Sequence, residues 1–194
     1  FTVDGWWCKL SETTSGFNHG DGDFFGLYGS YKGIENITLD AYWMYVRDDG
    51  ALARAVLNAK DSDLHTVGLR LAGGCGAFDF SGEIAYQFGD VDMQKTPVLT
   101  LLGLDRDLDY NEFGANVELG YSFDAPWNPR AYIGGAFLGG GDDDTLSFNR
   151  LFTNHEYLAI LDDSDLSNLW LARGGVILHP TDALLLVGEV IYLE

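Results

Sequence analysis

Residues 76–90, GAFDFSGEIAYQFGD, alternate between apolar and polar side chains. The apolar set comprises Phe78, Phe80, Ile84, Tyr86 and Phe88, and the polar set comprises Asp79, Ser81, Glu83 and Gln87. Successive side chains of a β-strand point to opposite faces of its sheet, so this pattern predicts a strand with one apolar and one polar face. Residues 112–123, EFGANVELGYSF, repeat the pattern. A soluble sandwich with one buried face fits it, and so does a membrane barrel with a polar lumen.

Strand-like patterns recur along the whole chain. They predict about nine strands, at residues 1–10, 23–32, 37–48, 64–72, 77–89, 112–123, 130–138, 168–178 and 183–193. Long connections alternate with the short ones GIEN, GGCG, DAPWNP and HPTD. This alternation is typical of an up-and-down barrel in an outer membrane, whereas Greek-key sandwiches have no reason to show it. We therefore predict an all-β, antiparallel, up-and-down transmembrane β-barrel, with residues 1–194 as a single domain.

Three local features refine this prediction. In LRLAGGCGAFDF, a tight turn at Gly74 and Cys75 would place Leu71 opposite Phe78 and Arg70 beside Asp79. In LWLARGGVILHP the alternation changes phase near Gly174 and Gly175, which predicts a bulge and leaves the direction of Arg173 open. Aromatic residues near predicted strand ends would fit bands at the two lipid interfaces, although core aromatics give the same pattern; they are Phe24, Phe25, Phe88, Phe123 and Tyr192.

Composition narrows the classes of protein. The 30 acidic and 11 basic residues give a net charge of −19, which would repel nucleic-acid phosphates and so argues against a nucleic-acid partner. A hydrophobic content of 46% is too high for a disordered polymer. No apolar run approaches the roughly 18 to 20 residues of a membrane-spanning helix, so any membrane crossing would be by strands. Cys8 and Cys75 could pair in an oxidising compartment, but their spacing leaves this open.

Candidate functional residues lie on the polar faces and in the long connections. Arg70, Asp79, Glu83 and Glu118 are candidate pore-lining residues, because charged rings on a channel wall set what enters; the alternative is the solvated face of a soluble sheet. Asp142, Asp143 and Asp144 follow a glycine run, and a second acidic run covers 162–165. Such oxygen-rich loops can bind Ca²⁺, although most are simply solvated. No nucleophile elbow, metal-ligand spacing or phosphate-binding loop supports an enzyme, and we expect no other cofactor.

Two segments carry a resemblance to a known family. HTVGLRLAGGCGAFDFSGEIAYQFGD and FNRLFTNHEYLAILDDSDLSNLWLARGGVILHPTDALLLVGEVIYL resemble the alginate-export family of outer-membrane β-barrels. The resemblance covers most of residues 36–194. It implies a closed, many-stranded barrel that passes an anionic polysaccharide outward. Family members are markedly longer, so the nine strands are expected to be a consecutive part of a larger barrel. Arg70 and Arg173 match the lumen arginines of the family, whereas the acidic residues on the same faces depart from its arginine-rich pattern.

These observations lead to a main hypothesis and three alternatives. The main one is a non-enzymatic channel of the bacterial outer membrane that contacts lipid and lets a polysaccharide or small polar solute pass. A general porin that prefers cations is the first alternative. The second is a structural protein with a plugged lumen that holds an envelope protein partner or forms an oligomer. The third is a soluble β-protein that binds an apolar ligand.

Overall fold

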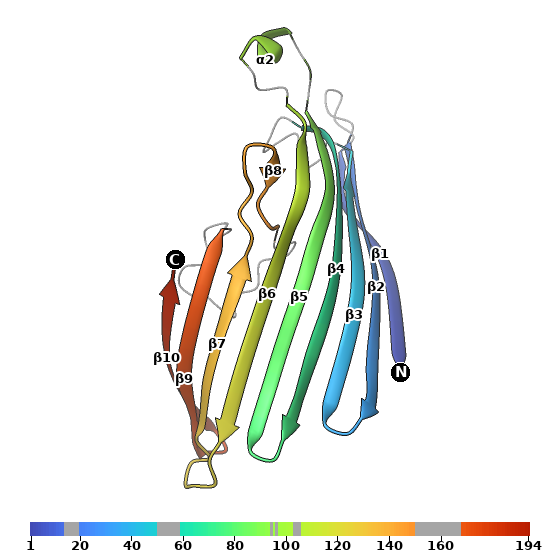
Figure 1. The fold of residues 1–194 in the computed structure, drawn as a ribbon. Helices are drawn as coiled ribbons and strands as arrows, with labels where there is room; N and C mark the ends of the chain where they lie inside the picture. The colour runs from blue at the N-terminus through green and yellow to red at the C-terminus, as the bar shows by residue number, and fades with distance from the viewer. Residues whose placement is uncertain (14–19, 50–58, 94, 96, 103–105, 150–167) are drawn as a thin grey trace.

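The protein forms one curved antiparallel β-sheet (Figure 1). The computed structural model describes residues 1–13, 20–49, 59–93, 95, 97–102, 106–149 and 168–194. Consecutive strands are neighbours throughout, apart from the two-residue strand β8, which pairs in parallel with β6. The elements are β1 (Thr2–Thr13), β2 (Gly20–Ile34), β3 (Ile37–Asp48), β4 (Ala59–Cys75), β5 (Phe78–Met93), α2 (Pro97–Leu102), β6 (Leu108–Ser122), β7 (Arg130–Leu138), β8 (Thr145–Leu146), β9 (Leu169–Thr181) and β10 (Leu184–Leu193).

The up-and-down topology confirms the predicted fold class and all nine predicted strands. The short connections, at residues 35–36, 76–77, 123–129 and 182–183, lie at one end of the sheet, and the long ones connect the strands at the other (Figure 1). Several strands extend further toward the long connections than the sequence indicated, and neither β8 nor α2 was predicted. The sheet does not close on itself, because β1 and β10 lie at its two edges. This open shape is consistent with part of a larger barrel.

The predicted register of the β4–β5 hairpin is wrong by four residues. Cys75 lies opposite Phe78, so the turn comprises Gly76 and Ala77, and Leu71 faces Gly82 instead of Phe78. Gly76 takes the positive φ of 62° that a tight turn requires, and moving the turn there lets the ladder continue through 73–75. An even shift preserves side-chain direction, so the predicted faces remain correct although the predicted pairs do not.

The bulge predicted at Gly174 and Gly175 is also wrong. The ladder between β7 and β9 is continuous from Arg130–Ile177 to Leu138–Leu169, and the β9–β10 ladder passes both glycines without a shift. The irregularity lies instead between Leu184 and Leu186. The change in the apolar–polar alternation therefore comes from apolar side chains that face inward on an unbroken strand, and not from a bulge.

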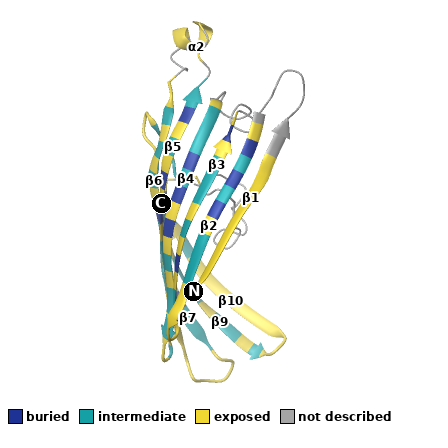
Figure 2. Ribbon diagram, turned by 90° about the vertical axis from the view of Figure 1, so that its right-hand side faces the viewer, coloured by how far each residue is buried: buried dark blue, intermediate teal, exposed yellow. Residues whose placement is uncertain are grey.

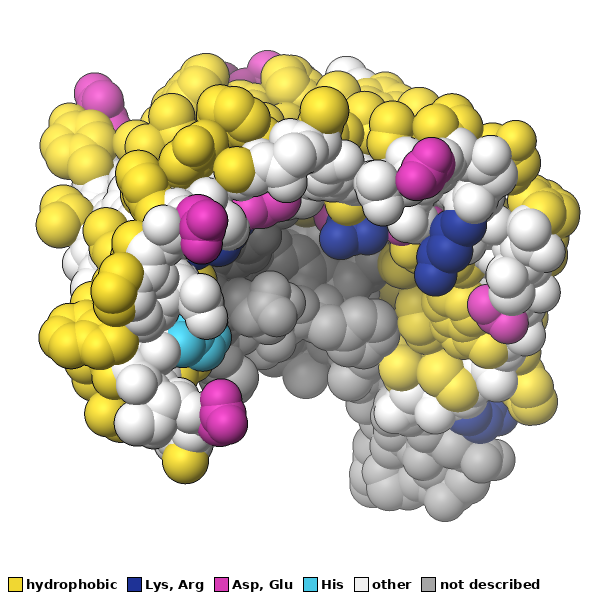
Figure 3. All heavy atoms as spheres, turned by 90° about the horizontal axis from the view of Figure 1, so that it is seen from below, with side chains coloured by type: hydrophobic (Ala, Val, Ile, Leu, Met, Phe, Trp, Pro, Cys, Tyr) yellow, Lys and Arg dark blue, Asp and Glu magenta, His cyan; other side chains and the backbone are white. Residues whose placement is uncertain are grey.

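No second protein layer covers the convex face of the sheet within the described residues. Large apolar side chains remain exposed along this face, including Ile84 at 52% and Val117 at 60%. Figure 2 shows how buried and exposed residues alternate along β2 to β5. Viewed from the end with the short connections, hydrophobic side chains dominate the outer rim and Lys and Arg side chains are visible on the inner rim (Figure 3). A soluble sandwich would need a second layer over this face, and the described residues supply none.

Two aromatic bands border the convex apolar zone. Near the long connections the rings of Tyr45, His65 and Phe88 stack in sequence, and Phe25 stacks on Tyr45. Near the short connections Tyr121 contacts both Phe78 and Phe123. Phe24, predicted for such a band, is instead buried on the concave face.

The distance between the aromatic bands matches a bilayer core. From Phe78 to Phe88 along β5, residues rise about 3.3 Å each, and with the tilt of roughly 40° usual for barrel strands they span a height of about 25 Å. Beyond the band near the long connections, the next outward row is charged: Asp23, Arg47, Asp63, Asp90 and Asp109 lie opposite one another in order. The convex face therefore has the profile of a lipid-exposed surface.

A pair of substitutions on β5 tests this lipid exposure. Ile84→Arg places a charge on the convex face near mid-strand and should lower the free energy of unfolding from lipid vesicles by roughly 2–4 kcal/mol. Ser81→Arg, on the concave face opposite Glu118, should lower it far less. Denaturant titrations of the full-length protein refolded into vesicles measure both. Equal losses for the two variants would contradict the assignment of the faces.

Candidate functional site

The concave face carries a row in which large polar side chains alternate with glycine. Across the sheet, Asp79 lies opposite Gly120, Gly120 opposite Tyr132, Tyr132 opposite Gly175 and Gly175 opposite Glu189. The adjacent row repeats the scheme with Glu118, Gly134 and Arg173. Each glycine leaves space above the backbone into which a neighbouring long side chain can extend. The row is therefore suited to side chains that contact one another across strands.

These side chains form a continuous network of charges. Arg130 donates hydrogen bonds to Asp79, with Nε 2.9 Å from Oδ2, and to Glu118 at 2.8 Å. Arg173 donates to the other oxygen of Glu118 at 2.5 Å and lies 3.7 Å from Glu189. Glu118 is thus shared by two arginines, and the network joins β5, β6, β7, β9 and β10. We call these five residues, Asp79, Glu118, Arg130, Arg173 and Glu189, the charge ladder.

Tyr132 and Gly120 position the two arginines. The Tyr132 hydroxyl donates to Glu189 at 2.8 Å, and its ring centroid lies 5.3 Å from the Arg130 guanidinium and 5.8 Å from that of Arg173, within cation–π range. A Cβ atom on Gly120 would overlap the Arg130 guanidinium, so only glycine lets this side chain cross β6 to reach Asp79. The ladder is therefore held in place before any solute arrives.

A second polar group lies on β3, β4 and β5. Arg70 donates to Asp40 at 3.0 Å, and the Asp40 side chain is only 3% exposed, whereas Arg70 keeps 41% of its side chain exposed. The Tyr42 hydroxyl donates to Glu83 at 2.5 Å. The carboxylates in this group are thus satisfied by neighbours on adjacent strands, while the Arg70 side chain stays accessible from the concave side.

All five pore-lining candidates lie on the concave face, but one predicted pair does not form. Arg70 lies opposite Glu83 and bonds Asp40, while Asp79 lies opposite Gly74 and bonds Arg130. The four-residue register shift separates the predicted partners. Arg173, whose direction the sequence left open, faces inward within the charge ladder. Whether these residues line a transport path stays a prediction.

Sequence reasoning missed five members of the site. Arg130 was hidden because it follows the turn DAPWNP, and Asp40 and Tyr42 because LDAYWMYVR is apolar at most positions on both faces. Tyr132 and Glu189 lie in segments dominated by apolar residues. The spacing of Arg130 and Tyr132 at alternate positions was the available signal, since it places both on one face.

Residues 139–149 return toward the inner wall near the long connections. β8 pairs with Asp109 and Tyr110 of β6, and the Phe148 ring lies over Gly114. Gln87, only 1% exposed, binds the backbone of Asn149 reciprocally: its amide donates to the carbonyl oxygen at 2.7 Å and accepts from the N–H at 2.6 Å. The same amide nitrogen donates to Thr66. One buried side chain thus attaches this segment to the concave face.

The acidic run in this segment forms a turn. The Asp142 carboxylate accepts hydrogen bonds from the Asp144 N–H and the Thr145 hydroxyl, and these bonds hold the pKa of Asp142 below its ordinary value. In the part of the chain that the structure describes, no group of three His, Cys, Asp or Glu side chains is arranged to hold a metal ion. Calcium binding at Asp142, Asp143 and Asp144 stays a prediction, and the run at 162–165 lies outside the described residues.

The two cysteines do not form a disulfide. Cys8 on β1 and Cys75 at the end of β4 are both free and exposed. None of the described helices is long and apolar enough to cross a bilayer.

Replacing Gln87 tests the attachment of residues 139–149. Gln87→Met keeps the side-chain length but removes both bonds to Asn149, each contributing about 1 kcal/mol, so amide exchange at Asn149 should quicken roughly tenfold to thirtyfold. Thr66→Val is the matched control, because it removes only the bond from Gln87 to the threonine hydroxyl. Hydrogen exchange resolved at Asn149 measures both variants. Unchanged exchange in Gln87→Met would show that Gln87 does not hold the segment.

Comparison with known proteins adds one match to this geometry. No curated protein sequence matches the chain. A family model described as alginate export matches residues 18–191, nearly the whole length, which agrees with the all-β architecture and supports an outer-membrane barrel for polysaccharide export. The chain belongs to the alginate-export family.

Proposed function

We propose that this chain forms part of the wall of a passive channel in the bacterial outer membrane, through which a polar or anionic polysaccharide passes. The charge ladder on the concave face is the observation that carries this proposal. It joins five strands on the face opposite the apolar one. Charged groups arranged in this way are costly in a dry protein interior and stable beside water. The proposed channel performs no catalysis.

The ladder offers both hydrogen-bond donors and acceptors. Because Arg130 and Arg173 share Glu118, their positive charge is partly neutralised and attracts an anionic polymer less than isolated arginines would. Saccharide hydroxyl groups both donate and accept, so they can exchange hydrogen bonds with such a wall at each step. The geometry therefore suits a polyhydroxylated polymer in general, and an anionic one where Arg70 remains accessible.

The charge balance favours a second candidate, a porin that prefers cations. The carboxylates of Asp40, Asp79, Glu83, Glu118 and Glu189 outnumber the guanidinium groups of Arg70, Arg130 and Arg173 on the concave face. An excess of acidic groups on a channel wall raises the local concentration of cations. This candidate differs from the first in the solute that passes, not in the fold.

The proposal includes further strands that complete the barrel. The open edges of β1 and β10 would leave unpaired backbone groups in lipid, where each costs several kcal/mol. Strands from the same protein or from another copy would satisfy them. Contact with lipid on the convex face, and with an envelope protein or a second copy, belongs to the same proposal.

Two opposite substitutions in the ladder test the channel. Glu118→Gln removes a negative charge beside two arginines and should shift the reversal potential of the full-length protein in planar bilayers toward anion selectivity. Arg173→Gln should shift it toward cation selectivity. Salt gradients across the bilayer measure both, with Ser81→Thr on the same face as a neutral control. Shifts in the same direction for both variants would exclude the ladder from the conduction path.

The parent protein separates the main hypotheses. Conductance that uronate oligosaccharides block supports a polysaccharide channel. Strong cation selectivity without any block by oligosaccharides supports the porin. Absence of conductance from pure, folded protein would favour a structural protein with a plugged lumen.

A further inference from the structure

Three aromatic side chains lie on the concave face near the β1 edge. Trp6 lies opposite Gly26, and Tyr28 lies opposite Tyr42, which in turn lies opposite Gly68. The rings of Tyr28 and Tyr42 are parallel to within 5°, with centroids 6.1 Å apart. These three residues are the aromatic track. They are separate from the charge ladder, which lies on the strands from β5 onward.

Neighbouring glycines let these rings lie over the sheet. A Cβ atom on Gly26 would overlap the six-membered ring of Trp6, and one on Gly68 would overlap the Tyr42 ring. The rings of Trp6 and Tyr42 therefore lean along the sheet, with one side against backbone and the other toward the concave space. Trp6 keeps 37% of its surface exposed. A ring face at this position is therefore accessible to a molecule in the concave space.

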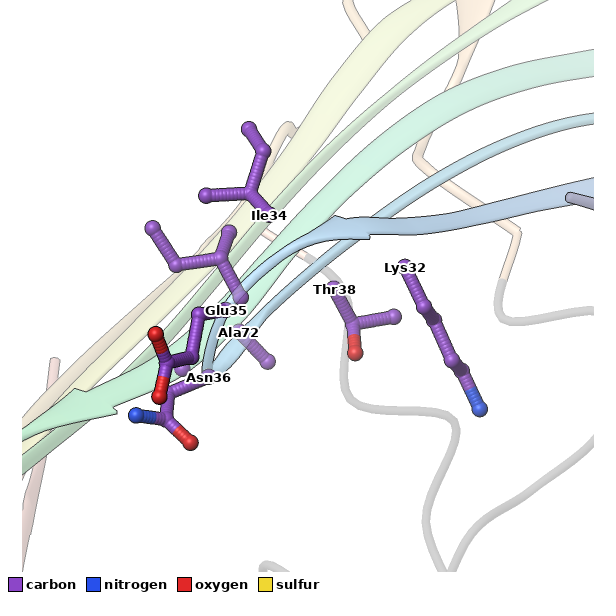
Figure 4. Close-up of a pocket in the computed structure, with 8 residues that line it drawn as sticks. Lys32, Ile34, Glu35, Asn36, Thr38 and Ala72 are labelled. Atoms are coloured by element: carbon purple, nitrogen blue, oxygen red, sulfur yellow. The ribbon is translucent and has the colours of Figure 1, made fainter.

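Polar partners fix the two tyrosines and supply contacts beside them. Tyr42 donates to Glu83, and the hydroxyls of Tyr28 and Ser30 both bond Asp40, which also accepts from Arg70. Toward the short connections β2 and β3 carry Lys32 and Thr38, in the stretch where the register between the two strands shifts after Tyr31. Both side chains extend on one side of the strands and Ile34 on the other, beside a shallow hollow of about 490 Å³ (Figure 4). Two cationic side chains, Lys32 on β2 and Arg70 on β4, thus lie on the short-connection side of the aromatic track.

We propose that the aromatic track is a saccharide-binding subsite, in which the C–H face of a pyranose ring stacks on Tyr42, Tyr28 and Trp6. A pyranose presents an apolar face of C–H groups and an edge of hydroxyl groups. The ring faces match the first, and Glu83 and the Arg70 guanidinium, whose side chain is 41% exposed, match the second. Stacking holds each sugar weakly and without regard to its charge, so a polymer can move along the wall. This inference rests on the proposed polysaccharide channel and adds where the polymer is bound.

Block of single channels by oligosaccharides tests the subsite. Tyr42→Leu and Trp6→Leu in the full-length protein should each shorten the residence time of a blocking oligosaccharide about tenfold, the loss expected for one stacked ring. Both a uronate oligosaccharide and a neutral one of equal length should show this change. Tyr42→Phe keeps the ring and loses only the bond to Glu83, so its residence time should stay within about twofold.

Trp43→Leu is the matched control on the convex face, because Trp43 has the same exposed fraction as Trp6, 37%, but points outward. It should leave residence times unchanged.

Open-channel conductance equal to that of the parent shows that each variant has folded. One outcome is that the parent conducts and is blocked by oligosaccharides, and that the residence times in Tyr42→Leu and Trp6→Leu equal that in the parent. This outcome would overturn the proposed subsite but not the proposed channel. Loss of block in Arg70→Gln alone would assign binding to charge and overturn stacking. A parent without conductance would overturn the channel itself.

Discussion

The structure depends on one constraint: a single sheet must satisfy its own backbone and present each side chain to one of two surroundings. Apart from the two-residue β8, each strand from β2 to β9 pairs with a neighbour on both sides, so most of its backbone groups find their partners within the sheet. In hydrocarbon this is a requirement, because an unpaired N–H or C=O finds no water there. With no second layer within the described residues, alternation along each strand decides directly which side chains lie on the convex face and which on the concave face. The aromatic bands and the charge ladder both follow from this.

Side chains are more crowded on the concave face than on the convex face. Side chains on the inside of a curved sheet converge, and several of them are long and charged. Glycine at alternate positions of a row, as at Gly120 and Gly175 beside Tyr132, gives these side chains room to extend across neighbouring strands. Each charge then finds a partner on another strand, so the ladder also ties the strands together. The same arrangement supports the aromatic track, where Gly26 and Gly68 lie beneath rings.

The two ends of the sheet have different roles. At the short connections, two-residue turns at 35–36, 76–77 and 182–183 set the register of their hairpins. At the long connections residues 139–149 fold back against β5 and β6, and buried Gln87 fixes their last described residue. Asp79 and Gln87 are eight residues apart along β5, so a solute that moved along the inner wall would pass the charge ladder and this segment at different levels. On the proposed path, selection by the charged side chains and restriction by the shape of residues 139–149 would therefore occur at different places.

The sequence by itself determined the strands, their up-and-down order and most of their faces, with the direction of Arg173 left open. The alternation around Phe78 to Phe88 and the alternating loop lengths suffice for this, because side-chain direction repeats every two residues. Tertiary structure alone decided the partners: Asp40 for Arg70, Arg130 for Asp79, and Asn149 for Gln87. A strand can slide by two or four residues against its neighbour without moving any side chain to the other face. Only the whole ladder, closed by Gly76 at its turn, selects one alignment, and with it the contacts between residues far apart in the chain.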